Sequence, residues 1–365
     1  MIKVVICGGG VIGTCTAYYL SLRGADVTVV ERAGIANAAS GKSGGFLALD
    51  WCRSTPVDPL ARRSFALHAE LDTKIDIDWG YRRIETLGIV ASPRRVLNHK
   101  HSATPLDWLG ENAALHGQLG TIQTTAQVTP GLFTQAMMTA SGAKLVEGAV
   151  DGIAVDSGTA RGIFVDGQLL TADAVVIAMG PWSLLACQWL PLPGIYGLKG
   201  QSIVFRYKPT TPRALFVELE DHDGETSTPE VMPRPDGTTY VCGLSGEAPL
   251  PVDPSQVGSE KGGPEKLRAI TSIFAPELAA ADVIATQACY RPITQDGMPI
   301  IGAIVGVNGA YVATGHGVWG ILNGPATGEA LAELIIDGAA KTVDISPFST
   351  ARLQVLDMSG LSVPN

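Results

Sequence analysis

The sequence lacks an excess of positive charge and has no long uninterrupted hydrophobic run. Its 35 acidic and 26 basic residues give a formal net charge of -9, which argues against nucleic acid or an anionic membrane surface as a partner. No apolar stretch is long enough to span a bilayer, so we predict no membrane span. The chain opens directly on a strand-like run, which we interpret as leaving no room for a signal peptide.

Paired cysteine motifs are missing as well. The six cysteines are scattered along 365 residues, and none forms a C-x-x-C pair or joins a Cys/His cluster with zinc-ligand spacing. We therefore predict no metal site, and scattered thiols favour a reducing, cytoplasmic location. Charged residues are few, at 17%, whereas glycines number 43. This composition is typical of a compact, turn-rich chain of one large or two smaller domains.

The N-terminus, by contrast, contains a complete dinucleotide-binding pattern. The apolar run Ile2–Cys7 predicts a buried parallel strand. Residues Gly8–Gly13 follow at once as G-x-G-x-x-G, then a helical stretch to Gly24 and a second strand, Val27–Val30, that ends on Glu31. A lone glycine motif would say little, but strand, helix and acid stand here in the βαβ order that binds a dinucleotide.

Each residue of this pattern has a physical role. Gly8 permits the tight turn, Gly10 lets the backbone approach a pyrophosphate at the helix N-terminus, and Gly13 allows close packing of helix on strand. Glu31 can accept hydrogen bonds from the adenosine ribose diol. The pattern alone does not show whether the bound cofactor is NAD or FAD.

The rest of the chain predicts two kinds of structure. Apolar runs at 174–178 and 309–314 indicate further strands of the nucleotide-binding domain, whereas 194–285 alternates strand-like runs with Pro/Gly loops, which indicates an antiparallel sheet. We predict an α/β fold with an α+β cap, in which a Rossmann-like FAD- or NAD-binding domain meets an antiparallel-sheet substrate domain. The predicted nucleotide-binding domain is discontinuous and comprises residues 1–50, 56–80, 123–193 and 286–365, and the substrate domain comprises 81–122 and 194–285.

Shorter features give local predictions. Asp58-Pro59 and Thr129-Pro130 are typical helix starts, with Asp58 and Thr129 as N-caps. Residues 150–173 alternate in the manner of a hairpin or meander. Segment 249–266, rich in Pro, Gly and charge, is predicted to be a mobile surface loop.

Five segments together resemble one known family. They are Gly8–Glu31, Ala39–Gly45, Met179–Trp182, Cys289–Gly302 and Thr314–Gly328. The fourth contains R-P-x-T-x-D-G-x-P and the fifth contains G-H-x-x-x-G-I-L, as in glycine oxidase-like enzymes. The chain is similar to the D-amino-acid oxidase superfamily of FAD-dependent oxidoreductases, which includes glycine oxidase, D-amino-acid dehydrogenase and sarcosine oxidase.

This resemblance implies that the cofactor is FAD. The turn from Gly315 to Gly324 would supply backbone N–H groups near flavin N1 and the C2 carbonyl, where the reduced flavin is anionic. Non-covalent FAD is the main expectation, and a covalent link at Cys289 is the alternative, because Cys289 aligns with the flavin-linked cysteine of sarcosine oxidase. The residues expected to bind FAD are Gly8, Gly10, Val11, Ile12, Gly13, Glu31, Arg32, Ser40, Ser43, Gly44, Gly45, Val150, Gly180, Trp182, Cys289, Gly315, Gly317, Val318, Trp319, Gly320, Ile321 and Leu322.

The resemblance also implies three catalytic residues. Arg291 matches the arginine that holds the substrate carboxylate, a role that suits a guanidinium fork; the alternative is a surface pair with Asp296. His316 would lie near flavin and substrate and bind a carboxylate or accept a proton, or else cap the backbone. Trp319 stands where sarcosine oxidase has a lysine and would shape an apolar wall beside the flavin.

Three further residues are pocket candidates. Glu230 stands in place of the tyrosine that meets the substrate in the Y-x-x-P-R segment of glycine oxidase. A solvated loop acid is the alternative, whereas a pocket position would favour a substrate with an extra amine. Trp51 and Arg53, just after the Gly44-Gly45 loop, are candidates for further substrate contacts.

The function implied is that of an FAD-dependent enzyme, an amino acid or amine oxidase or dehydrogenase. It would oxidise the C–N bond of a small amino acid or secondary amine by hydride transfer to flavin N5, with oxygen or another acceptor reoxidising the flavin. The alternatives are a protein of the same fold that acts on a non-amino-acid anionic substrate, and a non-catalytic structural or trafficking role. The sequence leaves the substrate and the oligomeric state open.

Overall fold

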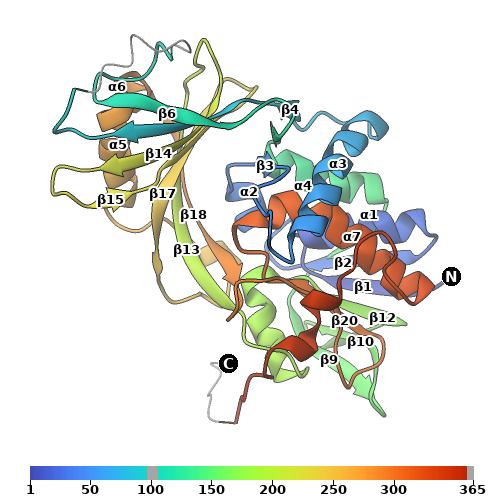
Figure 1. Ribbon diagram of the computed structural model, residues 1–365. Helices are drawn as coiled ribbons and strands as arrows, with labels where there is room; N and C mark the ends of the chain where they lie inside the picture. Colours follow the sequence, from blue (N-terminus) through green and yellow to red (C-terminus); the bar gives the residue numbers. More distant parts are fainter. Residues whose placement is uncertain (97–105, 360–365) are drawn as a thin grey trace.

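The protein has two halves, each built around its own sheet (Figure 1). The structure is a computed structural model that describes residues 1–96 and 106–359. One half holds the N-terminus and the sheet around β1, and the other half holds the largest sheet, with α5 and α6 against it. Within the described ranges, no helix has both the length and the apolar character needed to cross a membrane.

The nucleotide-binding half is built on a six-stranded sheet in the order β19-β20-β12-β1-β2-β8. Neighbouring strands run parallel, except that β19 is antiparallel to β20. Their bounds are β1 (Lys3–Cys7), β2 (Asp26–Glu31), β8 (Lys144–Glu147), β12 (Ala174–Ile177), β19 (Ile300–Ala303) and β20 (Ala310–Thr314). The central strands β1 and β12 are almost wholly buried, as parallel strands covered on both faces must be. The predicted Rossmann-like fold is confirmed.

Helices cover this sheet, and glycines let two of them approach closely. The helices are α1 (Val11–Leu22), α3 (Asp58–Lys74), α4 (Pro130–Ser141) and α7 (Gly320–Asp337). Helix α1 packs against both α4 and α7. A side chain at Gly328 would collide with the backbone of Cys15, and one at Gly324 would press on Val11. These glycines therefore set the distance between α1 and α7.

Pro325 interrupts the hydrogen bonding of α7, and α3 fills the gap. Proline has no N–H to offer the carbonyl of Ile321. His68 on α3 instead donates from Nε2 to the carbonyl oxygens of Ile321 at 3.0 Å and Leu322 at 3.2 Å. Ser64, also on α3, accepts the N–H of the residue after the proline at 3.0 Å. The first turns of α7 are therefore held by polar side chains of α3.

The two predicted helix starts are confirmed in position but not in capping. Asp58 lies inside α3, whose N-cap is Val57, and its Oδ2 accepts a hydrogen bond from Arg62 Nε at 2.9 Å. Thr129 is the N-cap of α4, with Pro130 in the first turn, but its side chain makes no capping bond. The N-cap role predicted for Asp58 is wrong because the helix starts one residue earlier.

Two three-stranded sheets and a helical turn complete this half. Strands β9 (Val150–Asp156), β10 (Thr159–Val165) and β11 (Gln168–Thr171) form the predicted meander. The order of the second small sheet is β3-β7-β4, with bounds Phe46–Ala48, Thr125–Gln127 and Arg82–Arg83. The helical turn α2 (Ala39–Lys42) lies directly before β3.

The other half is built on an eight-stranded sheet in the order β18-β13-β17-β16-β14-β5-β6, with β15 beside β14. All pairings are antiparallel except that of β14 with β5. The bounds are β5 (Thr86–Ala91), β6 (Ala113–Gly120), β13 (Tyr196–Phe205), β14 (Ala214–Glu220), β15 (Thr226–Ser227), β16 (Glu230–Pro233), β17 (Thr239–Glu247) and β18 (Val283–Ile293). Helices α5 (Gly263–Phe274) and α6 (Pro276–Ala280) complete a separate core. The predicted antiparallel sheet is confirmed, with one parallel pair.

Strand β18 links the two halves. It runs without a break through the predicted domain boundary between residues 285 and 286. It contacts α2 and the 3-10 helices η2 (Gly180–Gln188) and η4 (Gly317–Trp319) of the nucleotide-binding half. Its later residues therefore reach the nucleotide-binding half, while the domain boundaries stay a prediction.

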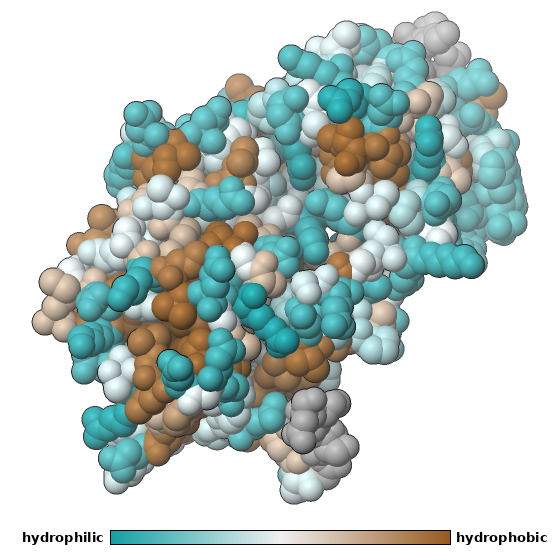
Figure 2. Space-filling model, turned by 180° about the vertical axis from the view of Figure 1, so that it is seen from behind, coloured by the Kyte–Doolittle hydropathy of each residue, from teal (hydrophilic) through white to brown (hydrophobic). Residues whose placement is uncertain are grey.

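The two halves also differ at the surface. Seen from behind, broad apolar areas lie over the nucleotide-binding half, whereas the surface of the other half is mostly hydrophilic apart from one apolar cluster (Figure 2). Leu145, Val155 and Leu169, on β8, β9 and β11, are among the exposed apolar side chains of the nucleotide-binding half.

Candidate active site

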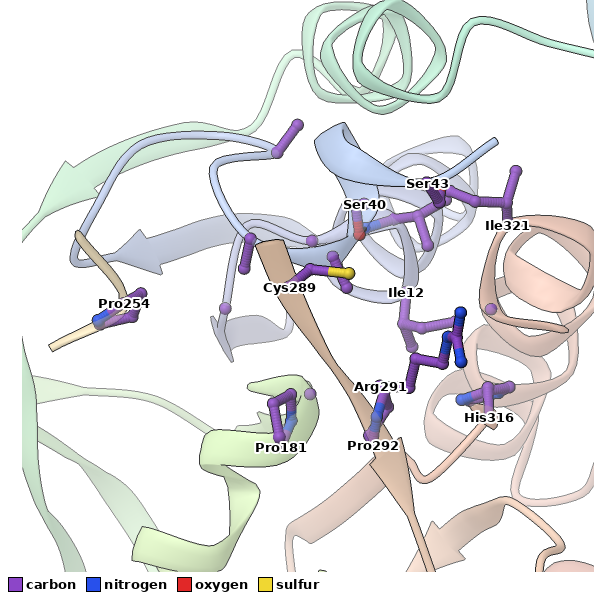
Figure 3. A pocket seen from close by; sticks show the side chains of 18 of the residues that line it. Ile12, Ser40, Ser43, Pro181, Pro254, Cys289, Arg291, Pro292, His316 and Ile321 are labelled. Atoms are coloured by element: carbon purple, nitrogen blue, oxygen red, sulfur yellow. Dashed lines mark hydrogen bonds between the residues drawn. The ribbon is translucent and has the colours of Figure 1, made fainter. Parts of the chain in front are cut away.

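A cavity of about 410 Å³ lies where the two halves meet. Its lining comes from the turn after β1, from α2 and the residues after it, from the start of α7, and from strands of the eight-stranded sheet. Figure 3 shows Cys289 and Arg291 projecting from one strand toward a hollow that Ser40 and His316 also border. The cavity therefore joins the predicted dinucleotide site to the predicted substrate residues.

The nucleotide end of the cavity is a turn that tolerates no side chains at two positions. Gly8 has a φ of +114°, and a Cβ there would collide with the carbonyl oxygen of Ala178. A Cβ at Gly13 would collide with the carbonyl oxygen of Gly8. The N–H of Val11, the first of α1, donates to Ser40 Oγ at 2.9 Å. The turn therefore needs its glycines, as the motif requires, and α2 is tied to it.

Glu31 is held in place at the end of β2. Its Oε2 accepts the N–H of Gly9 at 2.7 Å, and its Oε1 accepts the N–H of Ala33 at 2.8 Å. The residue lines the cavity, and each carboxylate oxygen keeps a second lone pair for a hydroxyl donor. This arrangement fits the ribose diol of a dinucleotide.

Most of the residues expected to bind FAD line this cavity. They are Gly8, Gly10, Val11, Ile12, Glu31, Arg32, Ser40, Ser43, Gly44, Gly45, Val150, Gly180, Trp182, Cys289, Gly317, Val318, Trp319, Gly320 and Ile321. Gly13, Gly315 and Leu322 lie outside the lining. A Cβ at Gly315 would collide with Thr294, so this glycine acts through packing, like Gly13, and Leu322 is buried in the core. The contacts of individual residues with FAD stay a prediction.

Residues 249–262, which we call the strap, contribute Val252 and Pro254 to the lining of the cavity. Trp182 Nε1 donates to the carbonyl of Pro251 at 2.7 Å, and Arg32 forms an ion pair with Asp253 at 3.9 Å. Helix α5 begins at the end of the strap. The surface loop predicted at 249–266 is therefore bonded to the nucleotide-binding half over part of its length and helical over the rest.

Arg291 reaches from β18 into the cavity. Its Nη1 donates to Ser245 Oγ at 2.8 Å, and its guanidinium lies over Gly200, where a Cβ would be 3.2 Å from Nη2. The alternative of a pair with Asp296 is wrong, because Asp296 forms its ion pair with Arg352 at 2.5 Å. The other guanidinium donors of Arg291 have no partner among the described residues, so they can bind a carboxylate in the cavity.

His316 lies buried in the turn between β20 and α7. Its Nε2 is 3.1 Å from Thr327 Oγ1, and its Nδ1 has no partner among the described residues. Burial lowers the pKa of His316 to about 3, so the ring is neutral at neutral pH. A neutral ring does not supply a cation for a carboxylate, and a ring with so low a pKa is a weak base, so the geometry fits a hydrogen-bonding role better than a proton-accepting one.

Cys289 is the one cysteine of the six that is not fully buried. Burial raises the pKa of its thiol, although the charges of Arg291 and Lys42 lower it. A raised pKa leaves little thiolate at neutral pH. The surroundings therefore favour non-covalent FAD, and the covalent link at Cys289 stays a prediction.

Four aromatic side chains, which we call the aromatic wall, line the cavity: Phe46, Trp51, Phe216 and Trp319. Ring centroids are 4.8 Å apart for Phe46 and Trp51, 5.0 Å for Phe46 and Phe216, 4.7 Å for Trp51 and Phe216, and 6.3 Å for Trp51 and Trp319. Each ring is half-buried, so the wall packs against itself and still presents apolar surface to the cavity. Both halves contribute to this wall, and the position of Trp319 beside a flavin stays a prediction.

Two of the three predicted pocket residues line the cavity, and the third does not. Glu230 and Trp51 line the cavity. The side chain of Arg53 lies outside the lining, is 68% exposed and pairs with Asp50 at 3.3 Å. The solvated-loop alternative for Glu230 is wrong, because the residue opens strand β16 and faces the cavity.

The sequence predictions missed much of the wall that the eight-stranded sheet supplies. Strand register places Phe216, Glu230, Cys242 and Ser202 in one row across β14, β16, β17 and β13, and all four line the cavity. Alternation along each strand could have shown which residues share a face. Only the pairing register shows which residues lie beside one another.

A cavity that begins at a dinucleotide turn and ends at charged side chains on a second sheet is typical of a dinucleotide-dependent oxidoreductase. The glycine turn, the fixed carboxylate of Glu31 and the unpaired Nδ1 of His316 fit an FAD in this cavity. Residues 3–334 match the family "FAD dependent oxidoreductase". The chain belongs to this family, and its cofactor is FAD, as the resemblance implied.

Individual relatives agree with this assignment. A Schizosaccharomyces pombe protein, whose name describes an oxidoreductase, is 31% identical, and the match covers 94% of this chain and 96% of that protein. Glycine oxidase of Pseudomonas aeruginosa is 27% identical over 96% of this chain and 98% of its own. The solved structure of glycine oxidase from Geobacillus kaustophilus has a TM-score of 0.78 and 25% identity, with 96% of this chain and 99% of that one covered.

Proposed function

We propose that this FAD-dependent oxidoreductase oxidises the C–N bond of a small amino acid or secondary amine. The position of Arg291 carries the proposal: it lies in the cavity that begins at the nucleotide turn, and most of its donors are free among the described residues. A guanidinium holds a carboxylate through two charge-assisted hydrogen bonds. The similarity to two glycine oxidases supports this class of substrate.

When bound, FAD supplies the acceptor for a hydride. The substrate loses a hydride from the carbon beside nitrogen and a proton from nitrogen, and water hydrolyses the resulting imine to a carbonyl compound and ammonia or an amine. The two electrons that leave the substrate with the hydride finally pass to oxygen or another acceptor. Arg291 fixes the carboxylate and so the direction of the reacting C–H bond.

Other residues of the cavity exclude water and offer a hydrogen bond. The aromatic wall excludes water from the substrate. His316, neutral and bonded to Thr327, offers a hydrogen-bonding atom near the substrate. The open cavity and the free donors of Arg291 support an enzyme over a protein with a non-catalytic role.

The test is an anaerobic titration of the FAD-loaded protein with glycine, sarcosine, proline and a set of D-amino acids. At least one of them should bleach the flavin absorbance. If none does, while dithionite still reduces the flavin, C–N oxidation is contradicted. A second panel of hydroxy acids and other anions then separates an enzyme with another substrate from a non-catalytic protein.

We also propose that the protein works in the cytoplasm. All six cysteines are free, which supports a reducing compartment. Cell fractionation with detection of this chain tests the proposal, and recovery from an oxidising compartment would contradict it.

A further inference from the structure

The substrate end of the cavity contains a second charged group that the proposed oxidation does not use. Four side chains with formal charge line the cavity among the described residues: Glu31, Arg32, Glu230 and Arg291. Glu31 and Arg32 lie at the nucleotide end, where both are bonded to neighbouring groups. Glu230 and Arg291 lie on the eight-stranded sheet. Arg291 has a role in the proposal above, and Glu230 has none.

Glu230 lacks a positive partner of its own. The described residues give it no ion pair, and Arg291 donates to Ser245 instead. Its Oε2 accepts a weak hydrogen bond from Cys242 Sγ at 3.7 Å, and its Oε1 has no partner among the described residues. Burial raises the pKa of Glu230 despite the nearby charge of Arg291. A cation beside this carboxylate would offset the cost of removing it from water.

The aromatic wall lies directly beside this carboxylate. Phe216 on β14 is the register partner of Glu230 on β16, and its ring packs against Phe46 and Trp51. Aromatic faces attract cations and also bury the methylene stem of a long side chain. A carboxylate next to such a surface is suited to a cationic group on an apolar stem.

We propose that Glu230 and the aromatic wall bind a second, cationic group of the substrate, so that the substrate class is amino acids with a cationic side chain. This inference rests on the proposed function for the role of Arg291. The substrate carboxylate would pair with Arg291, its stem would lie on the aromatic wall, and its terminal amine or guanidine would meet Glu230. The two charges of the cavity then match two opposite charges of one ligand.

The rival role for Glu230 is contact with the α-nitrogen, which every amino acid carries. The two roles differ in what they select. A carboxylate at the α-nitrogen would help all amino acids equally, whereas one at the side chain distinguishes arginine from its neutral isostere citrulline, and lysine from norleucine.

The test measures binding and flavin reduction with these pairs, using both enantiomers, in the FAD-loaded wild type and in Glu230→Gln. Apparent dissociation constants come from the change in oxidised flavin absorbance or, where reduction occurs, from the dependence of its rate on concentration. The wild type should bind arginine about tenfold more tightly than citrulline, as one charge-assisted hydrogen bond allows. In Glu230→Gln the two affinities should become equal within about twofold.

Controls keep the outcomes separate. Glu218→Gln changes an exposed acid on β14 and should keep the preference for arginine. Agmatine, which lacks the carboxylate of arginine, should bind poorly to every variant. Equal affinities in the wild type overturn the inference, and this comparison needs no variant. An equal loss for all four amino acids in Glu230→Gln also overturns it and places Glu230 at the α-nitrogen. If the preference for arginine is present but none of these ligands reduces the flavin, the binding role of Glu230 holds and oxidation of these amino acids is contradicted.

Discussion

The nucleotide-binding half shapes its end of the cavity with a glycine turn of the backbone, whereas the eight-stranded half contributes long charged side chains. Gly8 and Gly13 work by having no side chain where carbonyl groups approach. Across the cavity, Arg291 and Glu230 are long charged side chains whose positions depend on the strands that carry them. The first half fits a cofactor that many proteins share, and we propose that the second half selects the substrate.

The two halves show how one cavity can bind a cofactor at one end and a substrate at the other. The glycine turn and Glu31 are fixed by hydrogen bonds of the main chain, so changes in the eight-stranded half should leave them intact. Gly200 is the instructive exception, because there a missing side chain in the eight-stranded half makes room for Arg291. Substitutions in each half can therefore test this division.

Replacing Gly13 by alanine should abolish most FAD binding. The added Cβ meets the carbonyl oxygen of Gly8, which is backbone and cannot move aside. We expect roughly 100-fold weaker binding, at the upper end of the cost of overpacking. The measurement is the flavin-to-protein ratio after purification and its titration with added FAD.

The matched control is Gly117→Ala on β6, where a Cβ would meet nothing within 4 Å. This variant should keep its flavin. If Gly13→Ala binds as much FAD as the wild type, the claim that the cofactor needs a turn without side chains is contradicted.

Replacing Arg291 by alanine should leave FAD binding intact and lower activity. Loss of charge-assisted bonds to a carboxylate should lower kcat/KM by about 10- to 150-fold. Steady-state kinetics with the best substrate of the panel measures this. A rise in KM alone would mean uniform binding, and a fall in kcat would mean that Arg291 orients the reacting bond.

Arg53→Ala serves as the control, because its side chain is exposed and lies outside the cavity lining. It should leave kcat/KM unchanged. Unaltered kinetics in Arg291→Ala would remove the observation on which the proposed function depends.

His68 should make the nucleotide-binding half sensitive to acid. Burial lowers the pKa of His68 from 6.5 to about 4, so the folded state favours the neutral ring. The contribution of His68 to stability is complete above the unfolded pKa and is lost as the pH falls through the folded pKa. Near pH 5, about 2 kcal/mol of the free energy of unfolding should be lost relative to neutral pH.

Urea unfolding of wild type and His68→Gln, each saturated with FAD, measures this difference near neutral pH and near pH 5. The variant should show a smaller loss on acidification, because glutamine does not titrate. His222→Gln, at an exposed position, should behave like the wild type. Equal pH dependence in wild type and His68→Gln would refute a buried neutral His68.

Replacing Gly200 by alanine should have the smallest effect and sharpen the comparison. The Cβ would lie 3.2 Å from Arg291 Nη2 and 3.3 Å from its Cζ, so the guanidinium must shift by a few tenths of an ångström. We expect KM to rise about three- to tenfold with FAD retained. Gly246→Ala on β17, where a Cβ would meet nothing within 4 Å, should leave KM unchanged. If Gly200→Ala also leaves KM unchanged, the side chain of Arg291 adapts without cost.

The same division explains what the sequence could predict. The strand at Lys3–Cys7, the glycine turn and Glu31 lie within 31 consecutive residues, and local spacing defines a βαβ unit. The row of Phe216, Glu230 and Cys242 comes from three strands and depends on their register. Spacing along the chain contains no such information.

Two other features were beyond local patterns for the same reason. His68 and the residues of α7 that it supports are more than 250 positions apart in the sequence. Its hydrogen bond replaces one that α7 lacks because Pro325 has no N–H. The strap was recognisable as a loop, but its bond to Trp182 depends on how the two halves meet. Residues that act across long sequence separations need the structure to be found.

The most direct test of the account is an anaerobic single turnover with product analysis. The FAD-loaded protein is mixed with the substrate that bleaches it, and the carbonyl product and the released ammonia or amine are counted against the flavin reduced. The account predicts one carbonyl compound and one ammonia or amine for each FAD bleached. Bleaching without cleavage of a C–N bond, or no bleaching by any amino acid or secondary amine, would contradict it.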